Sequence, residues 1–483
     1  MQVQQEIKKG AITVFITKYS GIVIGLIVNS ILARLLSPSE FGVVGVITVF
    51  IAFFNILSDI GLGVAIVQNQ DLGKKDISDI FKLSFFLSVM LAVCFAGLSY
   101  AIAWFYQNDI YLIISKLLAI NVLFSALTVV PKNLLIKAKA FKTIGAVEVS
   151  VSLVTGVLAI FMANADWSYY AIVWRSIISS MGIFFLCLYF SGLKVQRGFS
   201  LKAARKVARY SMNQFAFNFI NYFSRNLDNI LIGKYMGSQS LGIYNQAYQL
   251  MTYPISNLTH VITPVLHPVL AQFQHNVQVI FTEYMKVVKI LAAIGIPISI
   301  FVYFSSDEII YLVLGERWME VVPILRVLSI SIWVQMISSS AGAIFQATGR
   351  TDILFRLGLS CSAIMIVAIV TGTLVFKSLI VTAYALVIAF WVSFVLIFFV
   401  LLHYIFRQPA SVFFSAIAKH FGLALAMIAG LWINSHQAAF QIVDAQSALI
   451  SLSIKSAIAF IIFSLFNISL IRKYLPGVPN PKL

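Results

Sequence analysis

The chain alternates between long apolar runs and short polar connections along almost its whole length. A membrane-spanning helix needs about 20 mostly apolar residues, and about fourteen runs approach or exceed that length. They lie near residues 11–33, 41–66, 80–105, 110–131, 143–165, 167–190, 210–236, 241–266, 284–305, 321–347, 353–376, 379–405, 412–433 and 447–471. The pattern therefore predicts an all-α, polytopic membrane protein.

The connections between these runs differ in charge on the two sides of the membrane. Alternate connections place only Arg34, Lys234, Arg317 and Lys377 on one side. The connections on the other side are rich in lysine and arginine, above all the loop 194–209. Because cytoplasmic loops carry the positive excess, the sequence predicts that both termini are cytoplasmic.

Composition supports this topology and narrows the function. Hydrophobic residues make up 60% of the 483 residues and charged residues 11%, whereas soluble domains have about 25% charged residues. The net charge of +17 follows the asymmetry of the loops, so it indicates topology and not binding to nucleic acid. The three cysteines lie in apolar runs without metal-ligand spacing, and the sequence contains no Walker motif. No metal or cofactor is expected.

Several charged residues lie inside the predicted spans. The cations are Lys18, Lys116, Arg175, Arg225, Arg326 and Lys455, and the acids are Asp59, Glu148 and Asp228. Individually, Lys18 and Lys455 can extend their amines to the membrane surface. Arg225 and Asp228, three residues apart, can form a pair on one helical face. As a set, however, the cations outnumber the acids, and an uncompensated positive interior is costly unless it lines water or meets an anion.

The sequence also contains two related halves. A shift of 200 residues aligns NSILARLLSPSEFGVV at 29–44 with NILIGKYMGSQSLGIY at 229–244. The informative pairs are Arg34 with Lys234, Gly42 with Gly242 and, after a shift of 210 residues, Lys116 with Arg326. Repeats of about six spans both start on the cytoplasmic side, so they are parallel repeats. This organisation predicts a two-lobed transporter with a cavity between its lobes.

Two stretches resemble a known family. They are ARLLSPSEFGVVGV followed by LSDIGLGVAIVQ at 57–68, and LDNILIGKYMGSQSLGIYNQAYQL at 227–250 followed by the proline-broken PISNLTHVITPVLHPVLAQFQ at 254–274. Both resemble bacterial polysaccharide flippases of the branch that includes colanic-acid and teichuronic-acid exporters. This branch belongs to the multidrug/oligosaccharidyl-lipid/polysaccharide exporter superfamily. The resemblance covers essentially the whole chain.

The resemblance implies two six-helix bundles that open alternately to the two sides of the membrane. The expected divisions are a first bundle at 1–190, a basic cytoplasmic linker at 191–209, a second bundle at 210–407, and an extra transmembrane helix pair with a tail at 408–483. The expected cargo is an undecaprenyl-pyrophosphate-linked oligosaccharide repeat unit. The expected location is the bacterial cytoplasmic (inner) membrane, where the chain would export a surface polysaccharide.

The interior cations are then candidates for holding the pyrophosphate, because arginine presents a planar fork of donors to phosphate oxygens. These candidates are Arg225, Lys116, Arg326, Arg175 and, near the cytoplasmic mouth, Lys18. Amides and aromatic hydroxyls suit a glycan. The weaker glycan candidates are Asn218, Asn221, Tyr222, Tyr244 and Asn245.

A proton or sodium gradient is the expected energy source, because the chain has no nucleotide motif. The acids within the predicted spans, Asp228, Asp59 and Glu148, are therefore candidates for ion coupling. Asp228 would hold the Arg225 guanidinium while the anion is absent and would release it on protonation. The expected partners are the lipid-linked glycan, membrane lipids and other polysaccharide-assembly proteins, with no nucleic acid.

Two other functional classes stay open at this point. An ion-coupled small-solute or drug antiporter can use the same architecture, although a cationic drug favours an acidic or apolar cavity and this interior is cationic. A membrane polysaccharide polymerase or glycosyltransferase needs acids, bases or metal ligands on a substantial outer domain. The outer connections are short, with 305–320 among the longest, so the chain is predicted not to be an enzyme.

Overall fold

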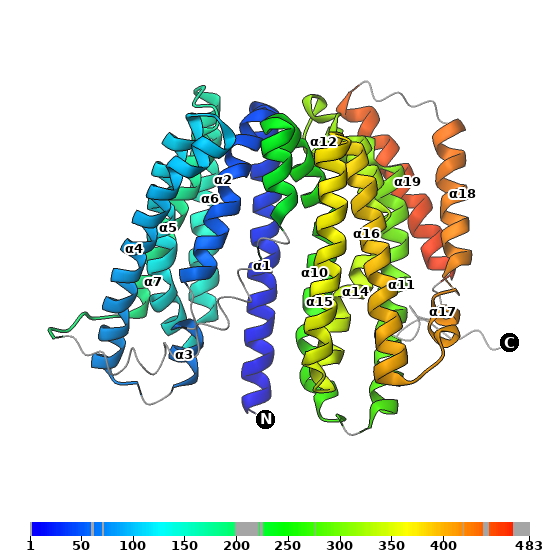
Figure 1. Ribbon diagram of the computed structural model, residues 1–483, viewed down its shortest axis with the longest axis horizontal. Helices are drawn as coiled ribbons and strands as arrows, with labels where there is room; N and C mark the ends of the chain where they lie inside the picture. Colours follow the sequence, from blue (N-terminus) through cyan, green and yellow to red (C-terminus); the bar gives the residue numbers. More distant parts are fainter. Residues whose placement is uncertain are drawn as a thin grey trace. The chain divides into compact units, whose positions relative to one another are not determined.

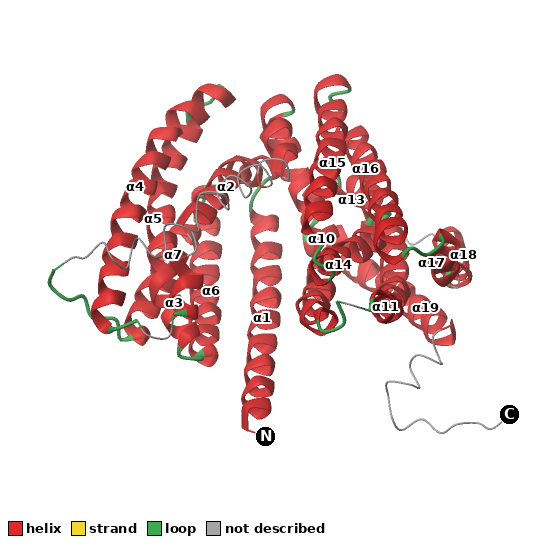
Figure 2. Cartoon of the chain, turned by 60° about the horizontal axis from the view of Figure 1, so that its bottom comes forward, coloured by secondary structure: helices red, strands yellow, loops and turns green. Residues whose placement is uncertain are grey.

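The computed structural model describes residues 2–58, 62–69, 72–198, 222, 226–274, 276–418, 420–437 and 444–466 (Figure 1). Every regular element in these ranges is a helix, and they contain no strand (Figure 2). Eleven of the described helices are long and apolar enough to cross a membrane, or up to twelve if a bent pair counts as one span. The prediction of an all-α polytopic membrane protein is confirmed. The predicted span at 210–236 lies largely outside the described ranges.

The chain divides into two compact units, Met1–Gly242 and Ile243–Leu483. The helices of unit 1 are α1 (Gln2–Leu35), α2 (Pro38–Ser58), α3 (Leu62–Gln68), α4 (Lys74–Tyr106), α5 (Ile110–Lys137), α6 (Phe141–Asn164), α7 (Tyr170–Ser191) and the first residues of α10 (Gly237–Ala271). The predicted bundle boundaries at 190 and 210 stay predictions, since residues 199–221 lie outside the described ranges.

Unit 2 contains the rest of α10 and all later elements. These are α11 (Val277–Phe304), α12 (Ser306–Val313), the 3-10 turn η1 (Glu316–Trp318), α13 (Val321–Ser329), α14 (Ile332–Ala347), α15 (Thr351–Val370), the π-helical turn η2 (Thr371–Val375), α16 (Leu379–Val400), the π-helical turn η3 (Leu401–Phe406), α17 (Ala410–Ala418), α18 (Phe421–Gln437) and α19 (Ala445–Phe466).

Small residues determine how helices pack inside unit 1. Helix α1 lies along α6, where Gly156 leaves room for the side chain of Val28 and Gly145 leaves room for Thr17. Without a hydrophobic driving force between helices in lipid, such close backbone approach is a main source of helix association. The same seam buries Leu32 of α1.

Helix α2 begins at a local signal that the sequence carries in full. Pro38 occupies the first turn, where its missing N–H removes no helical hydrogen bond. The Glu40 carboxylate accepts the backbone N–H of Ser37 at 2.6 Å, and the backbone N–H of Glu40 donates to Ser37 Oγ at 3.4 Å. This is a capping box. Ser168, in the connection between α6 and α7, also donates to Glu40, so the first turn of α2 is anchored from outside the helix.

The predicted continuous span at 321–347 is divided in the structure into α13 and α14, whose axes differ by 53°. A break in a spanning helix requires new partners for the backbone groups that it frees. Ser299 Oγ accepts the backbone N–H of Trp333 at 3.0 Å, and Ser331 Oγ donates to the Leu328 carbonyl at 2.7 Å. The backbone groups at the bend are therefore hydrogen-bonded by serine side chains of unit 2.

Two further segments differ from the sequence expectation. The connection at 305–320 folds into α12 and η1. Helix α10 continues through Pro254, Pro264 and Pro268, which the sequence pattern suggests as interruptions. A proline removes one backbone hydrogen bond, whereas ending the helix would leave several polar groups unsatisfied in an apolar environment, so the helix continues.

The C-terminal helix pair packs on α11 and α12 of unit 2. Helix α18 lies against α19, where Gly430 brings the α18 backbone close to Ile458 and Ile462. Leu423, Met427 and Leu431 of α18 are buried in the same apolar cluster. The predicted extra helix pair is thus present in the described residues and joins unit 2 mainly through apolar contacts.

The start of α19 is also encoded locally. Asp444 accepts the backbone N–H of Ser447 at 2.8 Å, and Ser447 Oγ accepts the backbone N–H of Asp444 at 3.1 Å. The backbone hydrogen bond from Ser447 holds the pKa of the Asp444 carboxyl below its ordinary value. This reciprocal cap defines where the last described helix begins.

Candidate functional site

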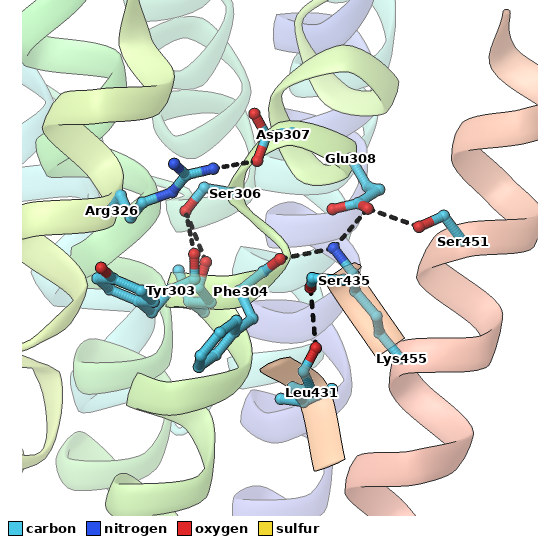
Figure 3. Close-up of polar contacts among 11 residues, drawn as sticks. Tyr303, Phe304, Ser306, Asp307, Glu308, Arg326, Leu431, Ser435, Ser451 and Lys455 are labelled. Carbon is cyan, nitrogen blue, oxygen red and sulfur yellow. Dashed lines mark hydrogen bonds and ion pairs between the residues drawn. The ribbon is translucent and has the colours of Figure 1, made fainter. Parts of the chain in front are cut away.

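Helix α12 carries two adjacent acids that bind cations from different helices (Figure 3). Glu308 accepts Nζ of Lys455 from α19 at 2.6 Å. Asp307 accepts the guanidinium of Arg326 from α13. Three helices separated in sequence therefore meet in one charged cluster of unit 2.

The Glu308–Lys455 pair is almost fully buried, with side chains 5% and 7% exposed. Lys455 Nζ also donates to the Phe304 carbonyl at 2.6 Å, and Ser451 Oγ donates to Glu308 Oε1 at 2.6 Å. The other carboxylate oxygen, Oε2, accepts no hydrogen bond from the described residues. Lys455 is therefore the partner that neutralises Glu308, and its removal would leave a buried, uncompensated charge.

The local sequence favours a different use of Glu308. Ser305 and Glu308 have the S-x-x-E spacing of a capping box. In the structure the Ser305 side chain makes no cap, and its backbone N–H donates to the Phe301 carbonyl at 2.9 Å. Glu308 points instead to α19, where Lys455 lies near the middle of the 22-residue helix. A lysine so far from both helix ends cannot readily reach the membrane surface, which corrects the interpretation that Lys455 extends outward.

The Asp307–Arg326 pair differs in its exposure. The Arg326 side chain is 40% exposed and that of Asp307 is 36% exposed. Only one guanidinium nitrogen of Arg326 bonds to Asp307, and its other donors have no partner within the described ranges. A guanidinium held in this way keeps donors available for a second anion.

Lys116 occupies the equivalent position in unit 1. It lies on α5, is exposed, and donates to the Tyr100 hydroxyl of α4 at 3.0 Å. Its Nζ also lies 4.5 Å from the centroid of the Tyr100 ring. Each of the two cations paired by the 210-residue shift is thus held by one side chain from an earlier helix, Tyr100 of α4 or Asp307 of α12. A neutral phenol holds Lys116 and a carboxylate holds Arg326.

Arg175 has neither a counter-ion nor a hydrogen-bonding side chain among the described residues. It lies half-buried near the start of α7, and no acid or hydrogen-bond acceptor in the described ranges pairs with it. Lys18 is exposed on α1. Arg225 lies outside the described residues. The structure therefore shows the surroundings of Lys116, Arg175, Arg326 and Lys18, and their common role stays a prediction.

Among the described residues, the excess of positive charge in the interior is smaller than the sequence predicts. Arg326 and Lys455 pair with Asp307 and Glu308, which the sequence pattern assigns to an outer connection. These acids belong to the same polar cluster because residues 306–313 form α12 and pack against α13 and α19. The uncompensated cations among the described candidates reduce to Lys18, Lys116 and Arg175.

The glycan candidates are distributed differently from the cations. Asn218 and Asn221 lie outside the described residues. Tyr222 donates its hydroxyl to the Val49 carbonyl of α2, so this group is used within unit 1. Tyr244 is fully buried beside Tyr248, which leaves no part of its ring open in this structure. Asn245 is half-buried.

The acids considered for ion coupling also differ in placement. Asp59 lies outside the described residues. Glu148 on α6 accepts Lys132 Nζ of α5 at 2.7 Å, and both side chains are exposed by more than a third. Asp228 is buried and accepts the backbone N–H of Asn229 at 2.8 Å. Within the described ranges, no group of three or more His, Cys, Asp or Glu residues could hold a metal ion.

Comparisons with known proteins agree on the family and the fold. Residues 31–323 match a family model described as "Polysaccharide biosynthesis protein". The teichuronic acid biosynthesis protein TuaB of Bacillus subtilis (strain 168) is 30% identical, over 88% of each chain. The lipopolysaccharide biosynthesis protein WzxC of Escherichia coli (strain K12) is 25% identical, over 72% of this chain and 71% of its own.

Solved structures share the fold at low sequence identity. The lipid II flippase MurJ in an inward closed conformation superposes with a TM-score of 0.76 and 15% identity, over 95% of this chain and 100% of its own. An inward-facing multidrug resistance MATE family transporter of the MOP superfamily superposes with a TM-score of 0.63 and 15% identity, over 78% of this chain and 93% of its own. These likenesses show that the chain shares the fold of both proteins.

Proposed function

Because this chain belongs to the polysaccharide biosynthesis protein family of the multidrug/oligosaccharidyl-lipid/polysaccharide exporter superfamily, we propose that it flips polyprenyl-pyrophosphate-linked oligosaccharide repeat units across the bacterial inner membrane. The chain is a transport protein and not an enzyme. The observation that carries the proposal is the relationship to TuaB, which is named for teichuronic acid biosynthesis, over 88% of both chains. The fold is shared by a lipid II flippase and a multidrug transporter, so the sequence relatives, and not the fold, support the proposed cargo.

The cargo head group is a pyrophosphate, and three described cations suit it. Arg175 has no counter-ion in the described ranges, Lys116 is held only by a neutral phenol, and Arg326 keeps donors free beside Asp307. Charge-assisted hydrogen bonds from such groups to phosphate oxygens are about twice as strong as neutral ones. We assign these three side chains to pyrophosphate binding, with Arg225 and Lys18 as further candidates from the sequence.

Asp307 has a defined part in this proposal. Its carboxylate holds the Arg326 guanidinium while no substrate is bound, and the pyrophosphate competes for the same donors when it arrives. Both side chains of this pair are more than one third exposed. The exchange of Asp307 for pyrophosphate therefore does not leave an unpaired charge in a buried position. In this proposal Asp307 holds Arg326 until the anion arrives, which is the role that the sequence suggests for Asp228 toward Arg225.

Transport by alternating access, with both termini in the cytoplasm, completes the proposal. The asymmetry of Lys and Arg between the two sides supports the orientation. A proton or sodium gradient would drive the cycle, and buried Asp228 is the described acid best placed to bind the ion. An ion drives transport only if its affinity differs between the two facing states.

The proposal is tested by depleting the protein and analysing membrane lipids by mass spectrometry. If the chain flips this cargo, its depletion should cause polyprenyl-pyrophosphate-linked repeat units to accumulate in the cytoplasmic leaflet. A glycosidase added outside the cells should then reach these units only after the membrane has been permeabilised. Re-expression of the wild-type chain should clear them. A lipid profile that does not change on depletion would contradict the proposed cargo.

A further inference from the structure

One face of helix α10 in unit 2 carries polar side chains over about three turns. They recur at intervals of three and four residues, which places them on the same side of a helix. They are Asn245, Tyr248, Gln249, Thr252, Tyr253 and Ser256, and we call them the polar stripe. All six are half-buried or exposed, whereas Ala247 and Met251 on the opposite face are fully buried. The accessible face of α10 is therefore polar.

The opposite face of α10 packs within unit 2. Ser331 Oγ and Gln335 Nε2 donate to the sulfur of Met251, at 3.6 and 3.4 Å. Ser331 lies at the bend between α13 and α14, and Gln335 belongs to α14. Because Met251 lies on the side of the helix opposite to the polar stripe, the stripe is turned away from this contact.

Contact with lipid does not account for a face of this composition. The stripe extends over 11 residue steps, or about 16 Å, and lipid offers no hydrogen-bond partner over that length. Helix α16 of the same unit shows the usual pattern, with Ile388, Val395 and Phe399 exposed. Helix α10 has 35 residues, but it is not among the eleven described helices that are long and apolar enough to cross a membrane. Its polar face therefore suits water or a polar ligand.

The sequence repeat shows that packing alone does not require the polar stripe. Continued in the same register, the shift of 200 residues places six positions of α2 opposite the stripe, namely Gly45, Thr48, Val49, Ala52, Phe53 and Ile56. Only Thr48 among these has a polar side chain. A packing requirement of the repeated architecture would apply to both helices. The stripe thus indicates a function that belongs to α10 alone.

The chemistry of the stripe suits a neutral ligand rich in hydroxyl groups. It contains no charged residue, so neither a pyrophosphate nor a cation finds a counter-charge there. Gln249 Nε2 donates to the Tyr253 hydroxyl at 2.9 Å, and this hydroxyl keeps its own proton to donate. Thr252 and Ser256 donate to the carbonyls of Tyr248 and Tyr253, so their hydroxyl oxygens remain as acceptors. Sugar hydroxyls, which both donate and accept, match this arrangement.

We propose that the polar stripe of α10 binds the oligosaccharide of the lipid-linked cargo. The proposal rests on the flippase function proposed above and concerns the part of the cargo that the cations do not bind. It also changes the choice of residues made from the sequence. Asn245 belongs to the stripe, whereas Tyr244 is fully buried and does not.

The test compares two lipids that differ only in the glycan. Native mass spectrometry of the purified protein gives the dissociation constants for polyprenyl pyrophosphate with the full repeat unit and for bare polyprenyl pyrophosphate. Gln249→Leu and Tyr253→Phe should each weaken binding of the full lipid about two- to tenfold, the effect of one lost hydrogen bond, and leave binding of the bare lipid unchanged. Arg326→Ala should weaken binding of both lipids.

Two threonines of unit 2 provide a matched control. Thr252 of the stripe and Thr282 of α11 each donate to the carbonyl four residues earlier, at 2.7 and 2.9 Å. Replacement by valine therefore removes the same local hydrogen bond in both helices. Thr252→Val should weaken binding of the full lipid about two- to tenfold, and Thr282→Val should leave it unchanged.

The outcomes separate the stripe from the function on which it rests. Unchanged affinity for the full lipid in the three stripe variants would overturn the stripe as the glycan site, and so would an equal loss of affinity for the bare lipid. Either result leaves the flippase function intact. A wild-type chain that binds neither lipid would contradict the flippase function, and the proposed ligand of the stripe with it.

Discussion

Replacing Lys455 by methionine tests whether one buried ion pair holds the C-terminal helix pair on unit 2. Methionine keeps the length of the side chain and removes its charge. Glu308 would then remain 5% exposed, with Ser451 as its donor and no cation. Breaking a buried pair by removing one partner costs about 3–5 kcal/mol. At about 1.4 kcal/mol per factor of ten, the equilibrium for undocking α19 from α12 should shift by two to nearly four orders of magnitude.

The chain contains a second Lys–Glu pair that has the same N–O distance and serves as a control. Lys286 Nζ lies 2.6 Å from Glu283 on α11, but these side chains are 61% and 46% exposed. Exposed pairs contribute about 0–1 kcal/mol. Lys286→Met should therefore change little. The two pairs have the same residue types and the same N–O distance, and they differ in that the Lys455 pair is buried and joins two helices whereas the Lys286 pair is exposed on one helix.

Hydrogen–deuterium exchange followed by mass spectrometry measures the undocking directly. In the purified protein in nanodiscs, peptides from α18 and α19 should lose protection in Lys455→Met and keep it in Lys286→Met. The double variant Lys455→Met with Glu308→Leu should recover most of the protection, because an apolar replacement of a buried pair is often neutral or stabilising. Equal protection in Lys455→Met and wild type would refute the reasoning, and so would a double variant no better than the single one.

Four further predictions concern transport in reconstituted vesicles. Arg326→Ala should reduce glycan export by about one to two orders of magnitude, with partial recovery in Arg326→Lys because a point charge replaces a fork; full export by the alanine variant would remove Arg326 from the site. Asp307→Asn should lower the substrate concentration for half-maximal export by a few-fold, since it removes the carboxylate that competes for Arg326, and a raised value would contradict that role. Arg175→Ala should weaken export more than Lys116→Ala, because Arg175 has no local partner in the described ranges, and equal small effects would count against both. Asp228→Asn should keep substrate binding and weaken the response to an imposed proton or sodium gradient, and an unchanged response would exclude Asp228 from coupling.

Much of the fold follows from the sequence because lipid restricts the choice of structure. Backbone groups inside a membrane must be satisfied within helices or closed barrels, so long apolar runs predict helices directly. The start of α2 is also visible, since Ser37, Pro38 and Glu40 form a complete local signal. The bend between α13 and α14 is not visible in the same way. It depends on Ser299, which meets the backbone of Trp333 only after the helices have packed.

The charged cluster marks the limit of sequence reasoning. A lysine near the middle of an apolar helix signals that a counter-charge exists, but not where it lies. Its partner Glu308 is 147 residues away and carries a local capping-box pattern that suggests another use. The pairing of Lys116 with Arg326 under the repeat was visible from the sequence, whereas their different partners, Tyr100 and Asp307, depend on tertiary contacts.

The Glu308–Lys455 pair also has a consequence for how the chain is assembled in the membrane. A lysine at the centre of a lone helix costs about 2.5–3.5 kcal/mol on insertion. Glu308 precedes Lys455 by 147 residues, so translation delivers the acid to the membrane before the lysine leaves the ribosome. Helix α19 can then enter lipid against a counter-charge already in place. In a chain expressed as two fragments, the C-terminal fragment should therefore insert efficiently only when the fragment carrying Glu308 is made first.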